Sequence, residues 1–158
     1  MPVDSITIKS ILGLIPQHPP FRYIDDIIHI SVNDIVASYR FKEDEFFYKG
    51  HFPGNAITPG VILIETMAQT GVVALGIYQL MEQGNDIHKI KDITPLFSFV
   101  DKVEFTGLVR PGEKVMINAK KIYYRCGNIQ SAVSIKRENG EPVCRGQLTG
   151  SGVRMNEK

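Results

Sequence analysis

The 158-residue sequence has only two cysteines and no surplus of charge of either sign. Cys126 and Cys144 lack the spacing of metal ligands, so we expect no metal site, no disulfide scaffold and two free thiols. The 18 basic residues are balanced by 17 acidic ones, without a run of like charge. This balance excludes a dedicated nucleic-acid surface, and we expect no nucleic-acid partner.

Signals for export and for several domains are also missing. The N-terminal segment MPVDSITIKS has no apolar core of the signal-peptide kind, which predicts a cytoplasmic protein with reduced thiols. No linker, internal repeat or low-complexity tract interrupts the chain, and 43% of its residues are hydrophobic. That fraction is enough to build a core, so we expect a single domain over residues 1–158.

A short helix and two strands are predicted before residue 42. Residues 6–14 have helical spacing and are followed by a cluster of prolines that should end the helix. Residues 21–30 and 35–41 are rich in β-branched and aromatic residues, so each should form a strand. Glycines and prolines in residues 42–58 predict a loop with a constrained backbone.

The longest apolar stretch predicts a buried helix. Thr58 is a favourable N-cap and Pro59 suits the first helical position, so the helix should run from there to about Gln83. Apolar residues surround this segment on nearly every side, which is typical of a helix inside a core. Its polar residues argue against a membrane span, and we expect no membrane partner; they are Glu65, Thr66, Gln69, Thr70 and Gln79.

Four strand-like segments joined by short turns follow the helix: 96–106, 113–124, 129–137 and 143–149. Between the last two, Asn139-Gly140 indicates a two-residue type I′ hairpin, which needs positive φ at both residues. Only one long helix is available to cover the resulting antiparallel sheet. The sequence therefore predicts an α+β hotdog fold, in which a curved antiparallel β-sheet wraps around one long buried central helix.

A histidine and a glutamate carry the chemistry. His51 lies in the turn Gly50–Gly54, and Glu65 lies in the central helix where a core residue is expected. Histidine accepts a proton near neutral pH, whereas glutamate must lose contact with water to stay protonated there. The pair suits elimination of water from a 3-hydroxyacyl thioester, with His51 as the base at C2 and Glu65 as the acid at the 3-hydroxyl.

Two further residues could assist this pair. The first N–H groups of a helix have no internal partner, so the N–H of Gly60 could stabilise charge on the thioester oxygen. Gln69 follows Glu65 by four residues on the same helix face and could hold the carboxyl in one orientation.

These motifs resemble a known family. The sequence GHFPG at Gly50–Gly54, the Pro59-Gly60 pair and ETMAQ at Glu65–Gln69 are similar, piece by piece and in spacing, to the FabZ-type 3-hydroxyacyl-[acyl-carrier-protein] dehydratases. The resemblance extends to PQHPPFRYID at residues 16–25 and to VDKVEFTGLVRPGE at residues 100–113, and so covers most of the chain.

The resemblance implies conversion of a (3R)-3-hydroxyacyl-[acyl-carrier-protein] to the trans-2-enoyl product by a hotdog homodimer. His51 of one subunit would face Glu65 of the other, and dimers could assemble into a trimer of dimers. The substrate would be carried on the phosphopantetheine of an acyl carrier protein, with no metal or redox cofactor. Candidate walls of an acyl tunnel between subunits are Phe52, Ile57, Val61, Phe97 and Phe99, although ordinary core packing explains these five equally well.

The sequence departs from the family at four places: Gln17-His18-Pro19, Asn55-Ala56, Glu104 and Gly107-Leu108. Basic residues of the family are lost there, which would alter carrier-protein docking and fits a specialised pathway, such as polyene-type biosynthesis, as well as fatty-acid biosynthesis. Two alternatives stay open. One is a hotdog acyl thioesterase, and the other is a non-catalytic subunit that binds acyl thioesters.

Overall fold

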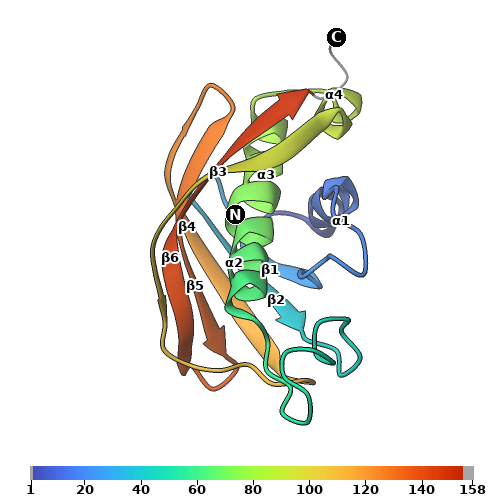
Figure 1. Ribbon diagram of the computed structural model, residues 1–158. Coiled ribbons are helices and arrows are strands. Elements are labelled where there is room, and N and C mark those ends of the chain that lie inside the picture. The colour runs from blue at the N-terminus through green and yellow to red at the C-terminus, as the bar shows by residue number, and fades with distance from the viewer. Residues whose placement is uncertain (1, 155–158) are drawn as a thin grey trace.

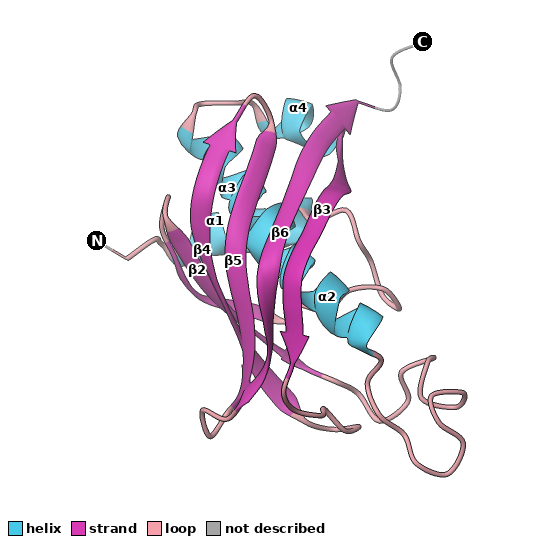
Figure 2. Ribbon diagram, turned by 60° about the vertical axis from the view of Figure 1, so that its left-hand side comes forward, coloured by secondary structure: helices cyan, strands magenta, loops and turns pink. Residues whose placement is uncertain are grey.

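A long central helix lies inside the curve of a six-stranded antiparallel sheet in the computed structural model, which describes residues 2–154 (Figure 1). The sheet order is β1-β2-β4-β5-β6-β3, and Figure 2 shows the strands side by side in front of the helix. This arrangement confirms the predicted α+β hotdog fold. The strands are β1 (Asp26–Ile30), β2 (Asp34–Arg40), β3 (Ile93–Phe105), β4 (Lys114–Arg125), β5 (Asn128–Arg137) and β6 (Pro142–Arg154).

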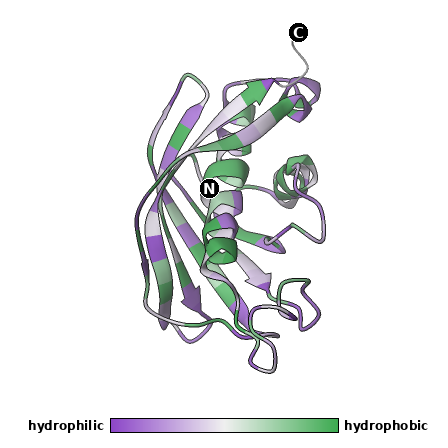
Figure 3. Ribbon diagram, viewed as in Figure 1, coloured by the Kyte–Doolittle hydropathy of each residue, from purple (hydrophilic) through white to green (hydrophobic). Residues whose placement is uncertain are grey.

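The central helix is continuous but changes its winding. It consists of α2 (Gly60–Ala68), a π-helical segment (Gln69–Ala74) and α3 (Leu75–Glu82). Much of the central helix is hydrophobic in Figure 3, with polar residues interrupting it, and Met67, Ala74 and Leu75 are fully buried. The expectation of one long buried helix is confirmed, although the π-helical segment was not predicted. Such π-helical turns occur often at functional sites.

Polar residues on this helix bond within the fold. Gln79 donates from Nε2 to the Val32 carbonyl (2.8 Å) and accepts from Lys121 Nζ (3.1 Å). By length and composition Gly60–Glu82 could cross a membrane, but 72% of the apolar window is buried inside the structure. The helix is therefore the core helix of the sheet.

The start of the helix differs from the prediction. Its N-cap is Pro59, and no side chain caps it, so the assignment of Thr58 as N-cap is wrong. The Thr58 hydroxyl is instead paired with the buried Tyr48 hydroxyl at 2.7 Å, and the Thr58 N–H donates to the Val109 carbonyl. The Thr58 hydroxyl therefore bonds to a residue of the preceding loop and not to the N-terminus of the helix.

The predicted strand over residues 21–30 is half as long as expected, because only β1 (Asp26–Ile30) is a strand. Asp25 still donates its N–H to the Ser38 carbonyl of β2, but Phe21 and Tyr23 bond to a side chain. The Phe21 carbonyl accepts from Gln69 Nε2 (3.0 Å), and the Tyr23 N–H donates to Gln69 Oε1 (2.7 Å). This segment is thereby tied to the π-helical part of the central helix, beside Glu65.

Two short helices flank the central one. Helix α1 (Ser5–Leu14) agrees with the prediction and lies on the side of the central helix that the sheet leaves open (Figure 1). Helix α4 (Ile87–Lys91) was not predicted, because five residues are too few to show helical periodicity. Asp86 caps it by accepting from the His88 N–H at 2.7 Å.

The prediction of a type I′ turn at Asn139-Gly140 is wrong, since only Gly140 has positive φ (91°) and its N–H donates to the Arg137 carbonyl. Both central residues have positive φ at Cys126-Gly127 (52° and 75°), which join β4 to β5. Cys126 is exposed on that turn, Cys144 is buried, and both thiols are free as expected.

Candidate active site

His51 is fixed by the loop that carries it. Its N–H donates to the Phe47 carbonyl (3.1 Å), and its own carbonyl accepts from the Ile57 N–H (2.9 Å). The imidazole Nδ1 lies 2.9 Å from the Ile57 carbonyl oxygen, and the ring stacks on Phe52 at 4.1 Å between centroids. A carbonyl can only accept, so Nδ1 carries the proton, and Nε2 of the neutral ring keeps a lone pair. This geometry would allow the neutral ring to accept a proton at Nε2.

Glu65 lies in a small pocket against the central helix. The pocket is lined by Gln17, Ala68, Val72, Val73, Pro95, Leu96 and Phe97 as well as Glu65 itself. Gln69 Nε2 donates to Glu65 Oε1 at 2.9 Å. Gln69 is fully buried and also bonded to the backbone of Phe21 and Tyr23, so the amide that donates to the carboxyl is itself fixed.

Burial in this pocket raises the pKa of Glu65 above its ordinary value. Loss of hydration is the largest cause, because it disfavours the charged carboxylate. The amides of Gln69 and Gln17 act in the opposite direction, since they donate hydrogen bonds to that carboxylate and lower its pKa. The net upward shift keeps more of the carboxyl protonated near neutral pH than an exposed glutamate would be, which suits a general acid.

Gly60 is the first residue of α2, at the positive end of the helix dipole. Ile62 and Leu63 both donate to the Pro59 carbonyl, so the chain turns tightly at this point. A Cβ on Gly60 would lie 3.1 Å from Phe105 Cζ, closer than ordinary van der Waals contact. Glycine thus lets Phe105 pack closely against the start of the helix, and the role of the Gly60 N–H stays a prediction.

Within one chain, His51 and Glu65 are not brought into a common pocket: none of the pockets described for residues 2–154 is lined by both. Of the five candidate tunnel residues, only Phe97 lines the Glu65 pocket. Phe52, Val61 and Phe99 are 51%, 71% and 69% exposed, and Ile57 is half-buried. Their tunnel role remains a prediction about an assembly of two chains.

Several contributors to the site have no signal of their own in the sequence. The Ile57 carbonyl fixes the His51 tautomer, and the backbone of Phe21 and Tyr23 fixes Gln69. A backbone group can act at any residue type, so only the fold identifies it. Gln17 was noted as a departure from the family, and the structure places it in the wall of the Glu65 pocket.

Two other departures have a structural explanation. Glu104 accepts from Arg145 through Nε (3.1 Å) and Nη2 (3.0 Å), so it belongs to an exposed ion pair between β3 and β6. Gly107 packs against the β6 backbone, where a Cβ would meet the Pro142 carbonyl oxygen at 2.9 Å. No group of three or more His, Cys, Asp or Glu side chains suited to a metal ion occurs in residues 2–154.

Comparison with known families identifies the family of this chain. The model of the FabA-like domain matches residues 15–147, which include the loop of His51, the central helix and most of the sheet. The chain belongs to the FabA-like family. The resemblance to FabZ-type dehydratases, which the sequence motifs indicated, is confirmed. The chain is a hydro-lyase.

Relatives of this FabA-like chain include the 3-hydroxyacyl-[acyl-carrier-protein] dehydratase FabZ of Caldicellulosiruptor saccharolyticus. The two are 37% identical over 142 residues, which cover 89% of this chain and 94% of the relative. The enzyme of the same name from Oenococcus oeni is 32% identical, over 90% of this chain and 96% of the relative. These alignments run through nearly the whole of each protein.

Solved structures of the same fold have little sequence in common with this FabA-like chain. The dehydratase heterocomplex ApeI:P from Xenorhabdus doucetiae superposes with a TM-score of 0.76 at 15% identity, over 93% of each chain. A hypothetical thioesterase with coenzyme A from Streptococcus pneumoniae gives 0.55 at 10% identity, over 84% of this chain and 88% of the other. At such identities the likeness extends to the fold alone.

Proposed function

We propose that this FabA-like chain dehydrates (3R)-3-hydroxyacyl thioesters, carried on an acyl carrier protein, to trans-2-enoyl thioesters. The observation that carries the proposal is the environment of Glu65, a carboxyl in a mainly apolar pocket whose pKa is raised by burial and whose orientation is held by Gln69. A protonated carboxyl is what a departing hydroxyl requires.

In this mechanism, His51 Nε2 removes a proton from C2 of the substrate while the C2–C3 double bond forms. Glu65 donates its proton to the 3-hydroxyl, which leaves as water. Negative charge that develops on the thioester oxygen is stabilised by the Gly60 N–H at the start of α2. Elimination of water needs no oxidant or reductant, so we propose that the phosphopantetheine-linked substrate is the only group the site must bind.

We propose that the complete site forms in a homodimer, with His51 of one subunit facing Glu65 of the other. Strand β3 is an edge strand of the sheet, and it exposes several large apolar side chains. Phe99 is 69% exposed, Leu96 and Phe97 are each 47% exposed, and Val61 near the helix start is 71% exposed. An apolar, unpaired sheet edge of this kind is typical of a surface that another chain covers.

The natural substrate would then come from fatty-acid biosynthesis in the cytosol, and the names of the FabZ relatives give 3-hydroxyacyl-[acyl-carrier-protein] as the substrate of those proteins. A polyene-type pathway remains within the proposal, because Glu104 and Gly107 stand where the family carries basic residues. Their loss would change which carrier protein docks, while the chemistry of His51 and Glu65 would stay the same.

An activity assay tests this proposal. Purified protein should convert a 3-hydroxyacyl-carrier-protein thioester to the 2-enoyl thioester, as detected by the conjugated product and by mass spectrometry. No free thiol should appear. Release of free thiol from the same substrate would instead indicate a thioesterase, and tight binding without any product would indicate a non-catalytic subunit. His51→Ala should abolish the enoyl product while the protein keeps its unfolding temperature.

A further inference from the structure

A second pocket lies behind Glu65, further along the central helix. It is enclosed by α3 and by strands β3, β5 and β6, at the end of the sheet where α4 lies (Figure 1). The cavity has a volume of about 80 Å³. Its side chains are almost all apolar, and Ile129 from β5 and Ile90 from α4 are buried within them. A narrow, apolar cavity of this kind suits part of a hydrocarbon chain.

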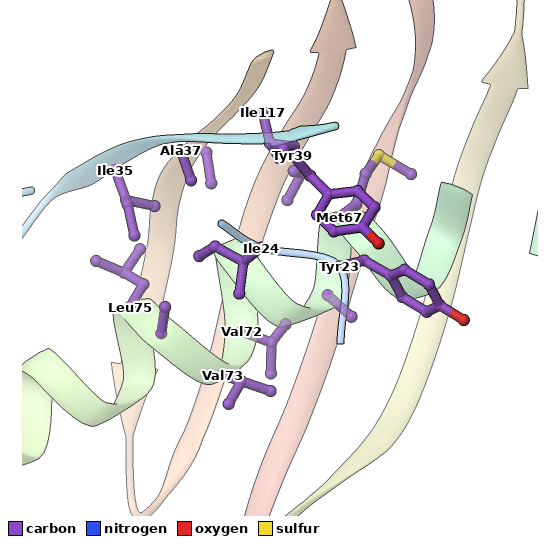
Figure 4. Close-up of a cluster of buried hydrophobic side chains, with 14 of the residues drawn as sticks. Tyr23, Ile24, Ile35, Ala37, Tyr39, Met67, Val72, Val73, Leu75 and Ile117 are labelled. Atoms are coloured by element: carbon purple, nitrogen blue, oxygen red, sulfur yellow. The ribbon is translucent and has the colours of Figure 1, made fainter. Parts of the chain in front are cut away.

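The second pocket adjoins the Glu65 pocket. Val72, Val73 and Pro95 belong to the walls of both. Figure 4 shows Val72 and Val73 projecting to the same side of the π-helical segment, away from Tyr39. These three residues therefore lie between the Glu65 pocket and the apolar space beyond it, and we call this boundary the neck.

Gly76 keeps this space open on the helix side. It lies in α3 and lines the second pocket. A Cβ at this position would have only one neighbouring atom within 4 Å, Ile129 Cγ2 at 3.9 Å, so the volume that a side chain would occupy is empty. The situation is the opposite at Gly71 in the π-helical segment, where a Cβ would lie 2.6 Å from Val133 Cγ2. Gly71 is required by close packing, whereas Gly76 leaves room.

We propose that the second pocket binds the distal part of a long acyl chain, and that Gly76 sets the upper limit of chain length. The proposal rests on the proposed function and names its substrate class, long-chain 3-hydroxyacyl thioesters. Gly76 follows Glu65 by eleven residues, or about 16 Å along a helix. A chain held at C3 by Glu65 would have to be long to reach it, and a short one would end before the neck.

The experiment compares 3-hydroxyacyl-carrier-protein substrates of four and twelve carbons on the wild type and on Gly76→Leu. Leucine at 76 would fill the pocket, so kcat/KM for the twelve-carbon substrate should fall at least tenfold while that for the four-carbon substrate stays within about twofold. Gly13→Leu, a matched change on α1 where a Cβ meets nothing within 4 Å, should leave both values unchanged. A general loss of folding would lower both activities together and would not change their ratio.

Two additional measurements separate an effect on the pocket from a loss of folding or of catalysis. Gly76→Ala fits the space and should lower the twelve-carbon value about fourfold, which is the loss expected for one displaced methylene. Affinity for non-reactive acyl-pantetheine thioethers should increase from four to twelve carbons in the wild type and not in Gly76→Leu. An unchanged length profile in a folded Gly76→Leu protein would overturn the inference. If the wild type binds the long thioether but dehydrates neither substrate, the proposed function fails and the acyl pocket stands.

Discussion

Replacement of Glu65 by glutamine should remove activity and at the same time stabilise the protein. Glutamine has the shape of a protonated glutamate, and its Oε1 can still accept from Gln69 Nε2, which lies 2.9 Å from the present oxygen. It cannot deliver a proton to the departing hydroxyl. Loss of a general acid typically lowers the rate by about 10²–10⁴-fold, which is about 3–5 kcal/mol in the activation free energy.

The stability change follows from the direction of the pKa shift. The folded-state pKa of Glu65 is raised above the ordinary value of 4.5, so the folded protein holds this proton more tightly than the unfolded chain does. The free energy of unfolding therefore falls as pH rises from about 4.5 through the folded-state pKa of Glu65, and the full loss of stability is present above that pKa. Glutamine is uncharged at every pH, so Glu65→Gln does not lose stability in this way.

Thermal unfolding measured from pH 4 to pH 8 tests this reasoning. Glu65→Gln should match the wild type at the acidic end and exceed it at pH 8 by about 0.5–2 kcal/mol, the usual size of a single stabilising substitution. For a protein of this length, each kcal/mol corresponds to a rise of about 2–4 °C in Tm. A variant that is less stable than the wild type at pH 8, or one that keeps wild-type activity, would refute the account of Glu65 as a buried acid.

Other predictions follow from packing and assembly. Gly76→Ala should raise stability by up to about 1 kcal/mol through helix propensity, whereas Gly71→Ala should lower it by about 1–3 kcal/mol through overlap with Val133, and equal Tm values for the two would contradict the packing described. Phe99→Asp, on the exposed edge strand, should yield monomers by light scattering and no activity, so an active dimer would rule out this edge as the interface. Gln69→Leu should cost about 1–3 kcal/mol in chemical denaturation, because the buried Tyr23 N–H loses its acceptor; no measurable loss would show that water replaces it.

The parts of the fold with a clear hydrophobic pattern or clear turn residues could be predicted from the sequence. The central helix is apolar on nearly every face, and the later strands are set off by turns, so both were found from the sequence with small errors in their ends. Errors arose where a tertiary contact overrode local preference. The Thr58 hydroxyl pairs with Tyr48 instead of capping the helix, and Gln69 binds the backbone of Phe21 and Tyr23, which lie outside the first strand.

The sequence was enough to predict which elements carry the candidate site residues, whereas their roles stay predictions and the backbone groups that fix them were not predicted. His51, Glu65, Gly60 and Gln69 lie in a compact motif, and each lies in the element that the sequence predicted. The carbonyl of Ile57 that fixes the His51 tautomer left no trace in the sequence, because every residue type offers that group. The pocket behind Glu65 could not be predicted from the sequence either, because its walls come from five or more elements that are distant in the chain.

The most direct test of the shared site uses two inactive variants. His51→Ala subunits and Glu65→Gln subunits are mixed, allowed to exchange until mass spectrometry detects hybrid dimers, and assayed with a 3-hydroxyacyl-carrier-protein thioester. A hybrid dimer contains one site with both native residues, so the mixture should recover up to about a quarter of wild-type activity when exchange is random. Verified hybrids that stay inactive would contradict a site formed by His51 of one subunit and Glu65 of the other.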